Sequence, residues 1–239
     1  MKSVDVAILP AEALALEADC YIVVDVLRAT TTIATLFERG LADLIVCNDI
    51  QLARDRARDE ARILFGEVGG LPPEGFDHGN SPVEADSLPV SGKRAVLFTT
   101  NGTSALCALG MRGMVLTGAL SNATAVARFA GDYRRVVVVC AGNGGGAGFS
   151  IEDFVAAGAI VQLLSHSEAP PALGDAALLA REISGDLRKI ATSKHARALA
   201  ALGLSEDILF ATQPDTSTAV PHVAETGPGW ARLVNAATR

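Results

Sequence analysis

Runs of apolar, mostly β-branched residues alternate with helical patterns through the first two thirds of this sequence. Two of the runs, YIVVDV and RVVVVCAG, are apolar at almost every position. Such runs are typical of strands that are buried on both faces, as in a parallel sheet. Strands are predicted at residues 4–9, 21–26, 44–47, 63–65, 95–98, 114–116 and 136–140, and helices at residues 31–39, 51–60, 104–111, 123–129 and 152–164. This alternation indicates βαβ units and therefore an α/β fold.

Two segments interrupt the alternation. Residues 66–89 are dense in Gly, Pro, Asn and Ser, which predicts a long loop, and loops of that length in compact domains are usually functional or mobile. After Ser165, the sequence predicts a linker followed by an amphipathic helix. The 239 residues are enough for one large domain or two small ones. We predict two α/β parts, residues 1–110 and 111–239, with mostly parallel or mixed sheets.

The composition excludes several classes of protein. Hydrophobic residues make up 49% of the chain and charged residues 20%, which is a globular rather than a disordered balance. No apolar run approaches the roughly 20 residues of a membrane helix, and the first residues lack a signal peptide, so we expect a cytoplasmic protein without membrane partners. A net charge of −7 without a basic stretch argues against a nucleic-acid partner.

The four cysteines are far apart, with no CxxC pair, and three of them lie within apolar runs. We therefore expect buried free thiols rather than disulfides or a zinc site. Cys140 invites comparison with the C-x₅-R loop of cysteine phosphatases, but Gly146 stands where that loop needs an arginine. We therefore do not expect a cysteine nucleophile.

Three predicted strands end in loops that are rich in glycine and small polar residues. The first loop carries Asp25, Arg28 and Thr30, the second reads TTNGT at residues 99–103, and the third reads AGNGGGAG from residue 141. In open α/β sheets, ligands bind beyond the carboxyl ends of the strands, and helix N-termini there attract anions. Each loop alone has a structural explanation, because threonines commonly cap helices. The three together favour anion binding, and phosphate is the anion that suits them best.

Phosphate binding to an acidic protein calls for a cation, and carboxylate ligands suit Mg²⁺. The acidic residues at predicted strand ends or loop starts are Asp25, Glu67, Asp77, Glu152, Asp153 and Asp215. Ser150 followed by Asp153 also fits a capping box, which would give Asp153 a structural role. Asp25 resembles the strand-end aspartate of haloacid-dehalogenase-type phosphatases, but Leu27 replaces the second aspartate of their D-x-D pair. We therefore expect Asp25 to be a metal ligand or a base.

Several segments of this chain resemble those of the 2-phosphosulfolactate phosphatase family. They are DVLRATTTI, GFDHGNSP, TTNGT, CAG with EDFVAAG, and DTSTAVP, and they follow the family's order over nearly the whole chain. The resemblance implies Mg²⁺-dependent hydrolysis of the phosphate ester of sulfolactate, which is a step of coenzyme M biosynthesis. It also implies that the site lies in the cleft between two α/β parts. We further expect a homodimer.

The resemblance and the chemistry of the loops together define the expected site. We expect Asp25 and Arg28 to be catalytic, with Mg²⁺ held by some of Asp25, Glu67, Glu152 and Asp153. The small anionic phosphorylated substrate is expected to contact Thr30, Asn80, Ser81, Thr100, Asn101, Gly102, Thr103 and Gly142. Asn80 and Ser81 have an alternative role as a turn before Pro82, and Arg28 has one in a surface ion pair.

Two other functions stay open. One is a haloacid-dehalogenase-like phosphatase with Asp25 as covalent nucleophile, which trapping with a metal fluoride would reveal. The other is a non-catalytic binder of anionic metabolites, which would show no turnover of phosphomonoesters with Mg²⁺.

Overall fold

Across the described residues, 2–166 and 169–236, the computed structural model contains one mixed β-sheet of ten strands. The strands are β1 (Ser3–Ala7), β2 (Cys20–Val24), β3 (Asp43–Cys47), β4 (Ile63–Gly66), β5 (Arg94–Phe98), β6 (Met114–Gly118), β7 (Arg135–Cys140), β8 (Ala172–Leu173), β9 (Pro221–Gly227) and β10 (Trp230–Asn235). Their order across the sheet is β4-β5-β3-β10-β9-β6-β2-β7-β1-β8. The predicted α/β class is confirmed, and each predicted strand is present with its ends shifted by at most two residues.

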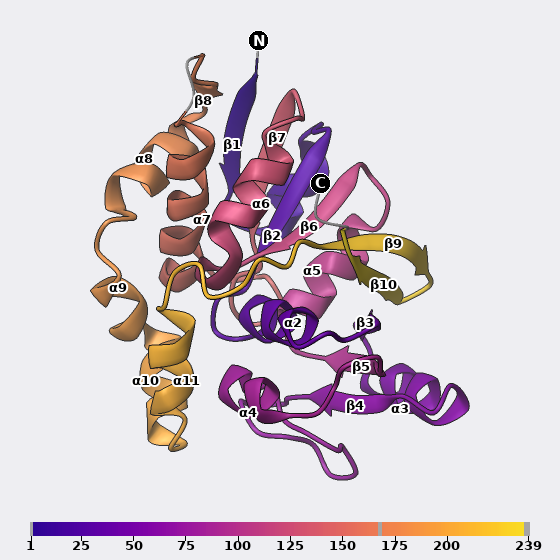
Figure 1. Cartoon of the computed structure of the whole chain (residues 1–239). Helices are drawn as coiled ribbons and strands as arrows, with labels where there is room; N and C mark the ends of the chain where they lie inside the picture. Colours follow the sequence, from indigo (N-terminus) through magenta and orange to yellow (C-terminus); the bar gives the residue numbers. More distant parts are fainter. Residues whose placement is uncertain (1, 167–168, 237–239) are drawn as a thin grey trace.

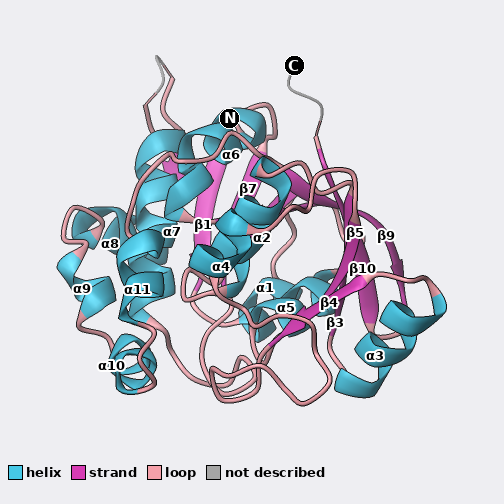
Figure 2. Ribbon diagram, turned by 60° about the horizontal axis from the view of Figure 1, so that its bottom comes forward, coloured by secondary structure: helices cyan, strands magenta, loops and turns pink. Residues whose placement is uncertain are grey.

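Helices flank the sheet on both sides (Figure 2). They are α1 (Pro10–Ala15), α2 (Ala29–Glu38), α3 (Ile50–Asp59), α4 (Pro82–Ser87), α5 (Gly102–Leu109), the 3₁₀ helix η1 (Leu120–Asn122), α6 (Ala123–Ala130), α7 (Ile151–Leu164), α8 (Asp175–Ile183), α9 (Arg188–Ala191), α10 (Lys194–Ala201) and α11 (Ser205–Ala211). The predicted helices correspond to α2, α3, α5, α6 and α7, and the amphipathic helix expected after Ser165 corresponds to α8. Within the described residues, none of these helices has the length and apolar character needed to cross a membrane.

The sheet consists of two parallel groups that are joined by a hairpin. Strands β6, β2, β7, β1 and β8 are parallel to one another, and so are β3, β5 and β4. The β9–β10 hairpin lies between the groups and pairs antiparallel with both. The two groups therefore run in opposite directions along the sheet. Because the sheet twists, the groups also point differently in space: in Figure 1, β1, β2 and β7 stand upright, whereas β4 and β5 cross the lower part.

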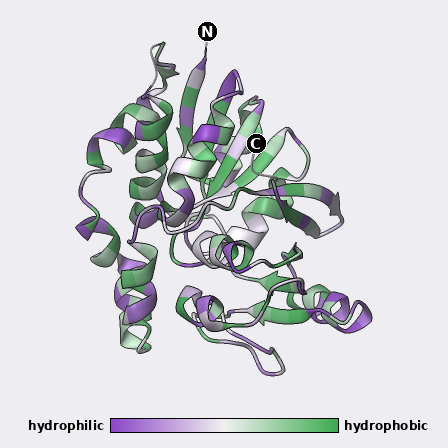
Figure 3. Cartoon of the chain, viewed as in Figure 1, coloured by the Kyte–Doolittle hydropathy of each residue, from purple (hydrophilic) through white to green (hydrophobic). Residues whose placement is uncertain are grey.

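Alternate residues of the central strands pack on opposite sides of the sheet. In β2, Ile22 and Val24 belong to a core under α6, α7 and α8, whereas Tyr21 and Val23 belong to a core under α1, α2 and α5. All four side chains are buried. This two-sided burial explains the near-continuous apolar runs of the sequence, which appear as green strands in the interior in Figure 3.

The prediction of an unbroken loop over residues 66–89 is wrong, because the segment contains α4. Ser81 caps this helix by accepting a hydrogen bond from Glu84 N at 3.1 Å, and Pro82 follows as its first residue. Proline suits that position because the first N–H of a helix has no partner within the helix. The alternative role expected for Ser81, a turn before Pro82, is therefore present as a helix cap.

The β9–β10 hairpin has no counterpart among the predicted strands. Gly227 and Trp230 pair across its turn, and Gly229 between them has a φ of 76°. A proline followed by a glycine in a two-residue turn is a local signal for this geometry, because proline presets φ and glycine tolerates a positive φ.

The division of the chain at residue 110 stays a prediction. Strands β1 and β2, from the first predicted part, pair in one sheet with β7 and β6, from the second. The strand order therefore does not follow the order of the chain.

Gly158 of α7 provides a test of the packing between α7 and α8. A Cβ at this position would lie 1.9 Å from the carbonyl oxygen of Ala180. We expect Gly158→Ala to destabilise the fold by about 3 kcal/mol through overpacking, although alanine favours helices, and to lower Tm by several degrees. The control is Gly185→Ala, because an added Cβ there meets no atom within 4 Å. Equal Tm values for the two variants would contradict the close helix contact.

Candidate active site

The loops that follow β2, β5 and β7 meet in one region. The backbone N–H of Gly145, in the loop after β7, donates to Asn101 Oδ1 at 2.8 Å, in the loop after β5. A Cβ on Gly102 would lie 2.7 Å from Asp25 Oδ2, which shows how closely the second loop approaches the first. The carboxyl ends of both parallel groups therefore build one site, as the three polar loops predict.

Asp25 is buried immediately beyond the end of β2. Its backbone N–H donates to Thr30 Oγ1 at 3.0 Å, and its Oδ1 accepts from Ala29 N at 3.3 Å. Burial raises the pKa of Asp25 from its ordinary 3.8 to about 6, while His195 lowers this pKa and the charge of Glu67 raises it. Thr30 is also buried and braces the loop rather than facing an open pocket.

Asp153 joins the loop after β2 to the loop after β7. Its Oδ1 accepts from Val26 N at 3.0 Å and its Oδ2 from Gly142 N at 3.1 Å. Ser150 caps α7 as expected, because its Oγ accepts from Asp153 N at 3.2 Å. The side chain of Asp153 bonds to other loops instead of completing a capping box. Burial, together with the charges of Asp25 and Glu152, raises the pKa of Asp153 well above its ordinary value.

Glu67 has a similar bridging geometry on the other side of the site. Its Oε1 accepts from Thr100 N at 2.8 Å and its Oε2 from Gly70 N at 2.9 Å. The loop after β4 is thereby tied to the TTNGT loop. Thr103 is an internal brace of the latter, since its Oγ1 donates to Thr99 O at 2.7 Å.

Glu152 lies next to a histidine that sequence reasoning missed. Glu152 is 2% exposed, and its Oε1 is 3.9 Å from His195 Nδ1. The same nitrogen is 3.2 Å from Asn143 Oδ1. His195 and Lys194 stand at the start of α10, which Ser193 caps. The Ser-Lys-His sequence identifies a helix start, but nothing in it indicates which part of the molecule that start faces.

These side chains line a pocket of about 560 Å³. Its polar lining comes from the loops at the strand ends and from α10, namely Glu67, Thr100, Asn101, Asn143, Glu152, Lys194 and His195. Asp25 and Asp153 are not in this lining and lie behind it. The pocket therefore combines two carboxylates with two basic side chains.

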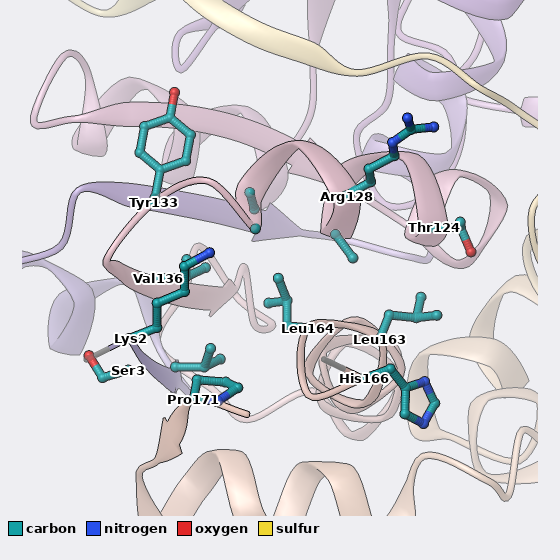
Figure 4. A pocket seen from close by; sticks show the side chains of 14 residues that line it. Lys2, Ser3, Thr124, Arg128, Tyr133, Val136, Leu163, Leu164, His166 and Pro171 are labelled. Atoms are coloured by element: carbon teal, nitrogen blue, oxygen red, sulfur yellow. The ribbon is translucent and has the colours of Figure 1, made fainter. Parts of the chain in front are cut away.

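A second hollow, of about 330 Å³, lies at the amino ends of β1 and β7 between α6 and α7 (Figure 4). Lys2, Arg128 and His166 contribute to its rim, and none of its described lining residues is acidic. In Figure 4 the guanidinium of Arg128 and the ring of His166 point away from each other rather than into the hollow. It lacks the converging polar groups of the first pocket.

Arg28 and Asn80 are both buried. Arg28 forms an ion pair with Asp207 at 2.7 Å and also donates to Gly70 O at 2.6 Å. The ion pair considered for Arg28 therefore exists, but it is buried rather than on the surface. The Oδ1 atom of Asn80 has no hydrogen-bond partner within the described part of the chain. Direct contact of Arg28 and Asn80 with substrate stays a prediction.

The donor set is compatible with Mg²⁺. Among the described residues, no group of three or more His, Cys, Asp or Glu side chains converges to hold a metal ion by itself. Mg²⁺ usually takes one or two carboxylates and completes its shell with water and substrate oxygens. Glu67 and Asp153 each accept two backbone hydrogen bonds, and Asp25 receives them from Ala29 and Gly102. Glu152 lines the pocket beside His195 and is the carboxylate most open to an ion, with Asp25 behind it. Which carboxylates bind Mg²⁺ stays a prediction.

The remaining acids and the cysteines lie outside this chemistry. Asp77 accepts from Leu64 N at 2.8 Å, and Asp215 accepts from Thr124 N at 2.9 Å. All four cysteines are free, and three of them are buried. Burial raises the pKa of Cys140 well above its ordinary value, whereas a nucleophilic cysteine needs a lowered one. The expectation of buried free thiols is confirmed for Cys20, Cys47 and Cys140, whereas Cys107 is free but only half-buried.

Comparison with known proteins adds an independent line of evidence. The family model described as 2-phosphosulpholactate phosphatase matches residues 9–226. A protein of Deinococcus radiodurans is 42% identical over 219 residues, which cover 85% of this chain and 87% of that protein. A protein of Thermus thermophilus is 40% identical over 222 residues, which cover 90% of this chain and 92% of that protein. A protein of Gloeobacter violaceus is 37% identical over 212 residues, which cover 87% of this chain and 90% of that protein.

Each of these three relatives is named a probable 2-phosphosulfolactate phosphatase. The family match over residues 9–226 includes every segment that lines the pocket. This chain belongs to the 2-phosphosulfolactate phosphatase family.

Proposed function

We propose that this protein hydrolyses the phosphate ester of 2-phosphosulfolactate, or of a closely related small anionic phosphomonoester, with the help of Mg²⁺. The observation that carries the proposal is the cluster of Asp25, Glu67, Glu152 and Asp153 at the carboxyl ends of two strand groups, beside a pocket with basic side chains. Membership of a phosphatase family supports hydrolysis of a phosphate monoester. A cytoplasmic location, a homodimer and a place in coenzyme M biosynthesis are further proposals from the sequence resemblance.

The substrate would carry phosphate, sulfonate and carboxylate groups, so it needs several favourable contacts with cationic or N–H donor groups. Lys194 and His195 line the pocket from α10. The N-terminus of α5, which starts at Gly102, adds the positive end of a helix dipole. The N–H groups of Thr100 and Gly142 already donate to Glu67 and Asp153. The first N–H groups of α5 are engaged as well, because Gly102 bonds to Asp25 and Thr103 N donates to Thr99. The main anion contacts are therefore assigned to Lys194 and His195 of α10.

Mg²⁺, when bound, would polarise the phosphoryl group and orient the attacking water. Asp25 and Glu152 would hold it, while Glu67 and Asp153 keep the loops in place. Offsetting the negative charges is itself a benefit, because the buried carboxylates repel one another and the substrate. A carboxylate of this cluster would accept the proton of the water.

Metal dependence is the first consequence of this proposal. Phosphate release from 2-phosphosulfolactate should disappear after exhaustive treatment with EDTA and return when Mg²⁺ is added in excess, because the carboxylate cluster repels the substrate without a cation. Release of phosphate should be followed as a function of free Mg²⁺. Full activity in metal-free protein would contradict the mechanism.

Replacement of Asp25 tests its part in the chemistry. Asp25→Asn keeps the shape of the side chain but removes its charge, and we expect kcat to fall by about 10²-fold or more, the scale of a lost acid–base group. The matched control is Asp215→Asn. The carboxylate of Asp215 also accepts a backbone hydrogen bond, but its partner is Thr124, outside the pocket. Near-parental turnover in Asp25→Asn would remove Asp25 from the site.

The raised pKa of Asp25 also predicts how stability depends on pH. Asp25 stays protonated to a higher pH in the folded protein than in the unfolded chain. Asp25 therefore hardly lowers the free energy of unfolding below pH 4, and it lowers this free energy progressively as the pH rises through about 6. A rise in pKa from 3.8 to about 6 corresponds to about 3 kcal/mol. In EDTA, the Tm of Asp25→Asn should therefore rise relative to that of the parent between pH 4 and pH 7. A Tm difference that is constant over this range would contradict the burial of a charged Asp25.

A further inference from the structure

A buried ion pair connects three segments that are distant in the sequence. Arg28, in the loop after β2, contacts Asp207 of α11 at 2.7 Å, and both side chains are 3% exposed. The two residues are 179 positions apart in the sequence. Ser81, the cap of α4, donates to the other carboxylate oxygen of Asp207 at 2.5 Å. The pair therefore fixes α4 and α11 to the end of β2.

The same pair reaches one wall of the pocket through Gly70. The second terminal nitrogen of Arg28 donates to Gly70 O at 2.6 Å, and Gly70 N donates to Glu67 at 2.9 Å. Glu67, Gly69 and Gly70 line the pocket, whereas Arg28 and Asp207 do not. Arg28 therefore lies behind the wall that these residues form.

The other wall is α10, which directly precedes α11 in the chain. It carries Lys194 and His195 into the pocket. The two walls also touch, because a Cβ on Gly70 would lie 2.8 Å from Leu202 Cδ1, just beyond the end of α10. A shift of α11 would therefore move both the basic side chains and the Glu67 loop.

Stability alone does not account for this arrangement. A buried ion pair pays a large desolvation penalty, and well-packed apolar residues of similar volume are often at least as stabilising. The pair also fixes the orientation of α11 relative to the loop that contains Gly70. The planar guanidinium of Arg28 donates to the Asp207 carboxylate and to the Gly70 carbonyl at set angles.

We propose that Arg28 and Asp207 are positioning residues, which hold the Glu67–Gly70 loop and α10 at the separation that the substrate requires. They act through those walls and do not contact the substrate. The kinetic part of the test rests on the proposed phosphatase function, whereas its hydrogen-exchange part does not.

The experiment compares the parent with Arg28→Lys, Asp207→Asn and the double variant. With 2-phosphosulfolactate and Mg²⁺, each single variant should lower kcat/KM by about tenfold or more. The kcat/KM of the double variant should lie within about threefold of that of the less active single variant, because both changes break the same link. Hydrogen exchange should become faster at residues 67–71 and 194–202 in each variant and stay unchanged in β2 and β7.

A matched control is available at the opposite ends of the strands. Arg62, before β4, forms an ion pair with Asp43 at the start of β3, and the side chains are 4% and 16% exposed. Asp43→Asn should keep kcat/KM within about threefold of the parent and leave exchange at residues 67–71 and 194–202 unchanged. Tenfold loss of kcat/KM in this control would overturn the inference, since any buried charge lost would then have the same effect.

Other outcomes separate the competing explanations. A loss of kcat/KM in Arg28→Lys with none in Asp207→Asn would mean that Arg28 grips the substrate directly, and would overturn the inference. Unchanged hydrogen exchange at both walls in folded Asp207→Asn would also overturn the inference.

If the single variants do not fold, Arg28→Met combined with Asp207→Leu replaces the pair by apolar side chains. Parental kcat/KM and exchange in that variant would overturn the inference, and faster exchange at both walls would support it. A parent that releases no phosphate would refute the proposed function, while the exchange data would still decide this inference.

Discussion

Repulsion between buried carboxylates is the interaction on which the rest of this site depends. Asp25, Glu152 and Asp153 lie close enough that the charges of the first two help to raise the pKa of the third. Such a cluster persists because backbone N–H groups approach it closely, as Val26 and Gly142 do at Asp153. The positive φ of Gly142 explains one of the glycines in these loops. The threonines brace the loops through their hydroxyl groups, as Thr30 does at Asp25 N and Thr103 at Thr99 O. A bound cation would remove the remaining repulsion and turn the cluster into a phosphate site.

The topology determines which loops can contribute to this cluster. A doubly wound sheet with one strand direction has all its carboxyl ends along a single edge. Here the β9–β10 hairpin joins two parallel groups of opposite direction. Loops from the carboxyl ends of both groups nevertheless meet, as the approach of Gly102 to Asp25 and the hydrogen bond from Gly145 to Asn101 show. Glu67 and the TTNGT loop come from one group, and Asp25 and Asp153 are held at the other. The pocket therefore has walls from both groups, and α10 forms its remaining side.

The sequence predicts this structure well where the determinants are local. The predicted strands are correct because an apolar run such as VVVVC is buried on both faces, and the polar loops are correct because strands end where such runs stop. The cap at Ser81 and the Pro228-Gly229 turn also have local signals. The contribution of α10 has none, since Lys194 and His195 reach the pocket only through tertiary packing. The partner of Arg28 is likewise beyond local reasoning, because Asp207 is 179 residues away.

The central claim is that carboxylates from both strand groups form one cation-dependent phosphate site. The most direct test is a crystal structure with Mn²⁺, as a substitute for Mg²⁺ with an anomalous signal, and orthovanadate as a phosphate analogue. The account predicts an anomalous peak at about 2–2.2 Å from a carboxylate oxygen of Asp25 or Glu152, with the vanadate in the pocket lined by Glu67 and His195. Mn²⁺ bound only elsewhere, or vanadate in the hollow beside Arg128 and His166, would contradict it.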